Sequence, residues 1–165
     1  MFVRAKTIKG KKYAYLVENI WKNKKVSQKV KDYLGNIVEL SDELIKEPNS
    51  VENYDWNQPL KLLFREIICD QFVSRGFIRK KWILKKDNLT INLSTNKIKK
   101  DDQEIVLFLN GRYLYGKLLN QIQNFYDVEE EDTPGQKLAK LFSDAGISIS
   151  KDVFVMLYKK IYINK

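Results

Sequence analysis

Histidine is absent from the 165-residue sequence, and cysteine occurs once, as Cys69. The usual serine and cysteine hydrolases need an imidazole base, so the composition argues against that class of enzyme. Most zinc sites need histidine or several cysteines, and an intrachain disulfide needs a second cysteine. A magnesium site built from aspartate and glutamate stays open. We expect a protein with no catalytic residue, no cofactor and no metal.

Long apolar runs are also missing, since no stretch approaches 18 consecutive apolar residues. We therefore expect no membrane span. The opening residues MFVRAKTIKGKK lack the apolar core of a secretory signal peptide, which predicts a cytoplasmic protein. Apolar residues make up 44% of the chain and charged residues 31%, a balance typical of a folded protein rather than a disordered one.

Positive charge is concentrated at the N-terminus. Residues 1–35 contain ten lysine or arginine residues and two acidic ones, a net charge of +8 out of +9 for the whole chain. A surface shaped by solubility alone mixes charges of both signs. A local block of positive charge indicates a polyanionic partner.

The same N-terminal stretch predicts a three-stranded antiparallel meander. Residues 2–8, 13–19 and 26–34 are rich in aromatic and branched side chains, with turn signals at Gly10 and Gly35. Strand alternation predicts one mostly apolar face, formed by Val3, Ala5, Thr7, Ala14, Leu16, Val26, Val30 and Leu34. The other face is expected to be basic and aromatic, with Arg4, Lys6, Tyr13, Tyr15, Lys29, Lys31 and Tyr33. A lone three-stranded sheet is marginal in water, so we expect the apolar face to pack on the rest of the chain.

The remaining residues predict an α+β protein in which this meander is followed by a helix, a small antiparallel sheet and C-terminal helices. The expected organisation is a basic module at 1–38, a short helix and linker at 39–58, and an α+β domain at 59–165. The expected helices are 41–47, 59–75, 113–125, 134–145 and 151–161, and the expected strands are 77–85, 88–94 and 104–109.

The basic-aromatic face of the N-terminal module is the strongest candidate for function. Lysine and arginine neutralise phosphates, and tyrosine and tryptophan can stack on bases or pack against sugars. The expected phosphate contacts are Arg4, Lys6, Lys9, Lys11, Lys12, Lys24, Lys25, Lys29 and Lys31, and the expected stacking residues are Tyr13, Tyr15 and Trp21. The alternatives are solvated strands protected against aggregation, or a contact with an acidic protein.

A family resemblance points the same way. Residues 1–35 resemble the N-terminal segment of insertion-sequence transposases at Phe2, Val3, Arg4, Lys9, Gly10, Tyr13, Tyr15, Leu16, Val17, Glu18, Gln28, Lys29, Tyr33, Leu34 and Gly35. The resemblance implies DNA binding, for example at the end of a mobile element. Those transposases continue into a longer nuclease domain with an acidic triad, which this sequence lacks. Residues 60–163 resemble short archaeal proteins that begin in the same way, and this second resemblance implies no activity.

A second basic stretch covers residues 75–86, which contain no acidic residue. Arg79, Lys80 and Lys81 could extend a nucleic-acid contact, and the alternative is a solvated edge strand. Two acidic groups were weighed as sites. The run Asp127–Asp132 precedes a helix start and is expected to be a solvated loop, and Asp101, Asp102 and Glu104 resemble a fragment of a nuclease cluster but are expected to form a hairpin turn.

These observations leave three hypotheses. The first is a non-catalytic protein that binds DNA or RNA through the N-terminal sheet. The second is a protein-interaction module or ribonucleoprotein subunit whose basic arm binds an acidic protein, and the third is a small metal-dependent nuclease. The sequence does not distinguish DNA from RNA or one strand from two.

Overall fold

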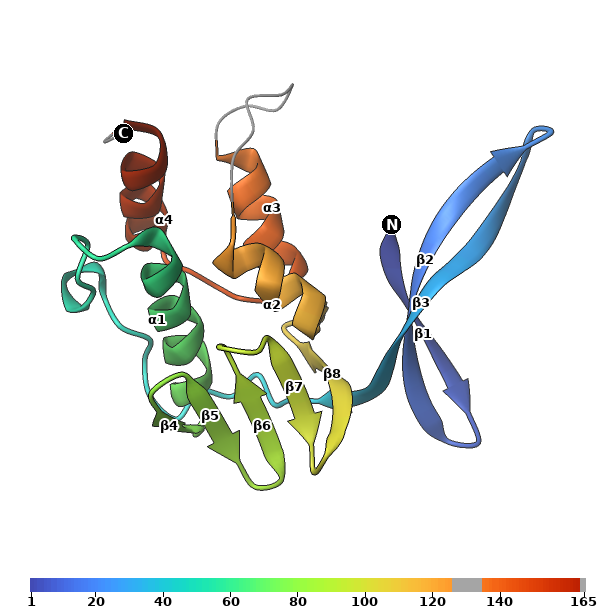
Figure 1. Cartoon of the computed structure of the whole chain (residues 1–165), viewed down its shortest axis with the longest axis horizontal. Helices are drawn as coiled ribbons and strands as arrows, with labels where there is room; N and C mark the ends of the chain where they lie inside the picture. The colour runs from blue at the N-terminus through green and yellow to red at the C-terminus, as the bar shows by residue number, and fades with distance from the viewer. Residues whose placement is uncertain (126–134, 164–165) are drawn as a thin grey trace.

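The computed structural model describes residues 1–125 and 135–163 (Figure 1). It confirms the α+β fold: an antiparallel meander, then a helix, a mixed sheet and C-terminal helices. In Figure 1 the meander forms an arm that projects from the body, and the α-helices gather on one side of the strands of the body. The N-terminus lies on the arm, and α4 lies at the far side of the body.

The arm consists of β1 (Phe2–Ile8), β2 (Lys11–Lys22) and β3 (Lys25–Glu39). The strands of the body are β4 (Ile78–Lys80), β5 (Ile83–Lys86), β6 (Leu89–Asn92), β7 (Lys97–Lys100), β8 (Gln103–Leu109) and β9 (Arg112–Leu114). Its helices are η1 (Val51–Asn53), α1 (Leu60–Val73), α2 (Gly116–Gln123), α3 (Gln136–Asp144), α4 (Lys151–Tyr158) and the π-helical turn η2 (Lys159–Ile163).

One parallel strand pair joins the arm to the body. The strand order is β1-β2-β3-β8-β7-β6-β5-β4, with β9 added to β8. Residues Asn36–Glu39 of β3 pair in parallel with Ile105–Phe108 of β8. The third strand was predicted to end at residue 34, because Gly35 looks like a stop. In the structure Gly35 lies inside the strand with φ +120°, where glycine lets the chain bend into the body.

The core is built around α1. Leu63, Phe64, Ile68 and Phe72 are fully buried, and the ring of Phe64 meets that of Phe142 edge-on at 5.9 Å between centroids. This helix closely follows the predicted range 59–75, with Pro59 at its start. Cys69 is also fully buried, as its helical spacing predicts, and burial raises the pKa of its thiol to about 12.

The expected helix at residues 41–47 is wrong. The segment is irregular, because several of its polar groups bond to distant parts of the body and not in the i to i−4 pattern of a helix. The N–H of Ile45 donates to the carbonyl of Ser74 at 2.8 Å, and the carboxylate of Asp42 accepts from the N–H of Asn110 at 2.7 Å. An isolated helix this short is marginal, so these tertiary bonds decide its conformation.

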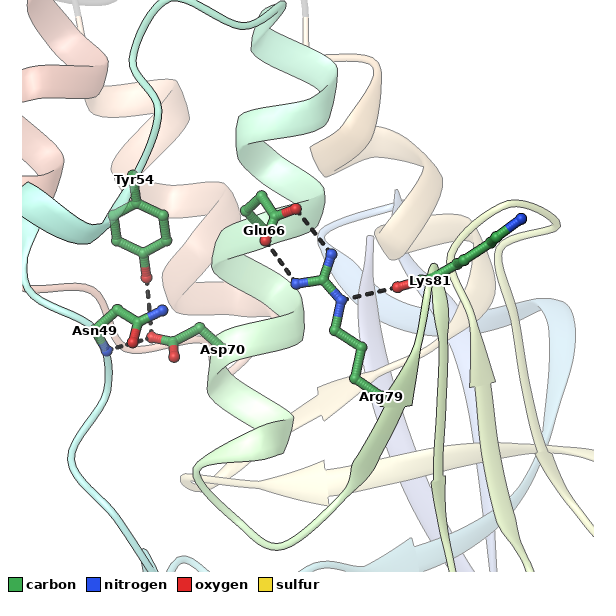
Figure 2. A network of polar contacts seen from close by, with 6 residues as sticks. All are labelled: Asn49, Tyr54, Glu66, Asp70, Arg79 and Lys81. Atoms are coloured by element: carbon green, nitrogen blue, oxygen red, sulfur yellow. Dashed lines mark hydrogen bonds and ion pairs between the residues drawn. The ribbon is translucent and has the colours of Figure 1, made fainter.

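The segment expected to be a linker, residues 49–58, is fastened to α1 (Figure 2). The buried carboxylate of Asp70 accepts from the N–H of Asn49 at 2.7 Å and from the O–H of Tyr54 at 2.9 Å. Burial, together with the adjacent carboxylate, raises the pKa of Tyr54. The bonds supply the partners that a buried carboxylate needs.

The sheet of the body also differs in detail from the prediction. The expected strand at 77–85 is a hairpin that turns at Lys81, whose φ is +53°. Strands β7 and β9 were not predicted, and α2 begins at Gly116 rather than 113 because residues 112–114 pair with β8 instead. Among the residues that the structure describes, no helix has the length and apolar character to cross a membrane.

Candidate nucleic-acid interface

The outer half of the arm is a two-stranded ribbon, which we define as residues 18–29. Strand β1 pairs with β2 from Lys11 to Val17, so beyond Val17 the ribbon has no third strand in the described part of the chain. From Glu18 to Lys22 it extends by about 13 Å at the usual rise per residue. Its turn, Asn23–Lys24, has positive φ at both residues (51° and 61°), as a two-residue hairpin turn requires.

Cross-strand register assigns the side chains of the arm to two faces. We call one the aromatic face; it carries Phe2, Arg4, Lys6, Tyr13, Tyr15, Val17, Asn19, Trp21, Val26, Gln28, Val30 and Tyr33. Arg4, Lys6 and the three tyrosines share it, as predicted. On the opposite face Val3, Ala5, Thr7, Ala14 and Leu16 lie together, also as predicted. Of these, Ala14 and Leu16 are buried, whereas Ala5 and Thr7 are exposed.

The prediction was wrong for the outer part of β3. Val26 lies opposite Trp21 and Val30 opposite Val17, so both valines belong to the aromatic face. Lys29 lies opposite Glu18 on the other face, and Lys31 forms an ion pair with Glu18 at 2.8 Å. The cause is a register shift between Leu16 and Val17. An extra residue on β3 at this point moves every β3 side chain between it and the tip to the other face.

The inner part of the aromatic face is held together by its own contacts. The ring of Tyr33 lies 5.4 Å from that of Tyr15 and 6.3 Å from that of Tyr13, centroid to centroid. The guanidinium of Arg4 donates to the side-chain oxygen of Gln28. These tyrosines therefore pack against each other and stiffen the base of the ribbon.

The tip of the ribbon carries the densest positive charge. Lys22 and Lys25 are direct cross-strand neighbours, and Lys24 lies in the turn between them. None of the three forms an ion pair with a residue that the structure describes. Like charges placed opposite each other destabilise a hairpin, so a bound anion would relieve the repulsion. Lys22 was absent from the predicted contacts, although the Asn-Lys turn signal could have placed it beside Lys25.

The other predicted basic residues lie at the opposite end of β2. Lys9 and Gly10 form the β1–β2 turn, with Lys11 beside it. The ammonium of Lys12 donates a hydrogen bond to the carboxylate of Glu39 at 2.5 Å, and this bond raises the pKa of the ammonium. About 36 Å of strand separates Lys11 from Lys22, so the predicted contacts form two groups rather than one.

In the second basic stretch, Arg79 is bonded to other residues of the body. The Arg79 guanidinium donates to both carboxylate oxygens of Glu66, at 2.6 and 2.8 Å, and to the carbonyl of Lys81 at 2.8 Å (Figure 2). It also lies 4.9 Å from the centre of the Trp82 ring. Lys80 and Lys81 are exposed, but they lie at the β4–β5 hairpin, at the far edge of the strand order from β1.

Replacement of Arg79 by alanine is therefore expected to affect stability rather than nucleic-acid binding. The variant loses a two-pronged ion pair and a cation–π contact, both partly exposed, so the free energy of unfolding should fall by about 1–2 kcal/mol. Urea unfolding measures this change, and Lys80→Ala is the matched control. A loss of affinity for DNA or RNA greater than that of an arm lysine variant would contradict this assignment.

The acidic residues weighed as a nuclease site do not converge. Asp101 and Asp102 form the turn between β7 and β8, as predicted, and Glu104 pairs with Lys97 at 3.0 Å. Across residues 1–125 and 135–163 there is no group of three or more histidine, cysteine, aspartate or glutamate residues placed to hold a metal ion. The acidic run Asp127–Asp132 lies outside the described residues.

No protein-family model, curated protein or solved structure matches this chain. The resemblance of residues 1–35 to insertion-sequence transposases, and that of residues 60–163 to short archaeal proteins, therefore stay predictions. The division into 1–38, 39–58 and 59–165 also stays a prediction. The geometry and charge of the arm are therefore the features of this protein that bear on its function.

Proposed function

We propose that this protein binds nucleic acid without catalysing a reaction, through contacts of the arm with the phosphate backbone. The observation that carries the proposal is the charge of the ribbon. Residues 18–29 contain four lysines and one acidic residue, Glu18, on a hairpin that projects from the body. Surface charge concentrated on one projecting element is typical of binding to a polyanion.

The dimensions of the ribbon support this proposal. Two paired strands are about 5 Å apart, and such a ribbon fits the major groove of B-form DNA, which is about 12 Å wide. Both edges of the ribbon are open, so lysines on either strand can approach phosphates on either side of a groove. Nucleic acid is available in the cytoplasm, which is the compartment that we propose.

The test is fluorescence anisotropy with labelled nucleic acid over a series of salt concentrations. We expect the Lys22→Gln, Lys24→Gln, Lys25→Gln triple variant to bind about tenfold more weakly at 0.1 M salt. Because each phosphate contact adds about 0.9 to the slope of log affinity against log salt, the slope should fall by roughly 2–3. The measurement is made on the full chain, and circular dichroism verifies the fold.

The matched control removes the same charge from the body. Lys46, Lys151 and Lys159 are exposed and lie outside the arm, so their triple replacement by glutamine should leave the slope within about 1 of the original. Equal losses for both triple variants would show that net charge alone determines binding. Absence of binding by the unaltered protein at low salt would end the proposal.

A second candidate function, protein binding, is favoured by the apolar side chains exposed on the aromatic face. Val26 and Val30 are 49% and 57% exposed on this face, on either side of Gln28, and exposed apolar side chains of this kind can contact a protein partner. An acidic protein partner would combine this face with the lysines. Saturable binding to such a protein, with no binding to nucleic acid, would favour this candidate.

A further inference from the structure

The tip of the ribbon presents different chemistry on its two faces. Trp21 is 75% exposed and lies directly opposite Val26 on the aromatic face. Lys22 and Lys25 form the adjacent pair on the other face. We propose that the ribbon enters a groove of duplex DNA and that Trp21, supported by Val26, inserts between base pairs as a wedge. This inference rests on the proposed function and names its substrate class.

The Trp21 ring is free to stack, unlike the other tryptophans. Trp82 lies within 5.4 Å of the guanidinium of Arg65 and within 4.9 Å of that of Arg79. The ring N–H of Trp56 donates to the carbonyl of Val51 at 2.8 Å, and its ring meets Tyr54 edge-on. Trp21 has no ring or cation partner among the described residues. Its indole is therefore available to a base.

The apolar tip is also separated from the rest of the aromatic face. The next cross-strand pair toward the base is Asn19 with Gln28, both polar, and Gln28 is held by Arg4. Trp21 and Val26 thus form a small apolar projection at the tip, next to a polar cross-strand pair. Apolar side chains inserted between base steps unstack them and bend the duplex, and Trp21 with Val26 supplies such a wedge at the tip.

The lysines next to the wedge can contact phosphates near an opened step only from the turn or around the edges of the two-stranded ribbon. Lys22 and Lys25 point to the face opposite Trp21, and Lys24 lies in the turn. An insertion that unstacks a base step costs a few kcal/mol, and additional backbone contacts offset that cost. Charge and wedge are thus placed on the same hairpin turn.

The arm suits duplex DNA better than duplex RNA or a single strand. The major groove of A-form RNA is too narrow for a ribbon, whereas that of B-form DNA admits one. Proteins that bind single strands offer several open aromatic rings for successive bases. On this arm Tyr13, Tyr15 and Tyr33 contact each other at the base, where Tyr33 stays 52% exposed, and Trp21 is the open ring at the tip.

The experiment uses the full chain and a DNA duplex with 2-aminopurine at successive positions and a donor and acceptor dye at its ends. We expect the protein to raise 2-aminopurine fluorescence severalfold, because unstacking relieves quenching, and to shorten the distance between the dyes. Trp21→Ala should abolish both signals, weaken binding about fivefold and leave the salt slope unchanged. Trp21→Phe should restore part of the signal. Trp21 is exposed, so neither variant should change thermal unfolding.

Ile78→Ala is the matched control, since Ile78 is 78% exposed on β4, outside the arm. It should bind and bend DNA as the unaltered protein does. Binding with no 2-aminopurine signal, or equal signals from Trp21→Ala, would refute the wedge and leave the proposed function standing. A tenfold preference for single-stranded DNA or duplex RNA would refute duplex DNA as the substrate class and nothing else. Binding to vesicles containing phosphatidylserine, with none to any nucleic acid, would refute both proposals.

Discussion

Shortening the ribbon is expected to reduce nucleic-acid affinity about 50-fold, the product of the tenfold loss for the three tip lysines and the fivefold loss for Trp21. The variant replaces residues 19–28 with an Asn-Gly turn, so that Glu18 and Lys29 flank the new turn as Lys22 and Lys25 flank the original one. The Glu18–Lys29 and Lys22–Lys25 pairs are four residues apart on β2, which is an even number. The shortened strands therefore keep their pairing register, and each remaining side chain keeps its face. The variant loses three lysines and Trp21, whose contacts with nucleic acid are together worth roughly 2 kcal/mol.

The shortened variant also distinguishes binding by the ribbon from binding by the remainder of the arm. Lys9 and Lys11 and the tyrosine cluster remain in place, as does the pairing of β3 with β8. Anisotropy titration gives the affinity, and thermal unfolding of the same sample shows whether the body is intact. Affinity within threefold of the original would move the interface from the tip to the β1–β2 turn, and the three lysines removed would then be solvated charges.

Replacement of Gly35 by alanine is expected to lower the free energy of unfolding by about 3 kcal/mol or more. A Cβ built at Gly35 lies 2.8 Å from the carbonyl oxygen of Glu104 and 3.3 Å from the Cα of Ile105. Both atoms belong to the backbone of β8, so no side-chain rotation relieves the clash. The backbone angle φ of +120° adds strain for any residue with a Cβ. We therefore expect β3 to separate from β8 at the junction of arm and body.

Urea unfolding measures the loss, and Gly10→Ala is the control. Gly10 also has positive φ, at +76°, but its Cβ would meet nothing within 4 Å. This control should cost about 1 kcal/mol, from backbone strain alone. Equal losses in the two variants would mean that close approach to β8 is not what requires glycine at position 35.

Local patterns in the sequence were sufficient for several features. The charge block of residues 1–35, the antiparallel meander, the helix built on Leu63, Phe64 and Phe72, and the burial of Cys69 all follow from composition and periodicity. Each depends on residues close together in the chain, where alternation and helical spacing act directly. The candidate interface at Arg4, Trp21, Lys24 and Lys25, drawn from charge and aromatic content, stays a prediction.

The remaining features were decided by contacts between distant residues. A single register shift near Leu16 put Val26 and Val30 beside the aromatic side chains and Lys29 on the other face, and strand alternation alone does not reveal such a shift. Arg79 was predicted to bind nucleic acid, but Glu66 and Trp82 engage it because α1 packs beside the β4–β5 hairpin. Composition thus determined that the arm is basic and β-rich. The tertiary structure decided which of its side chains share a face, because strand register and cross-chain pairing depend on residues far apart in the sequence.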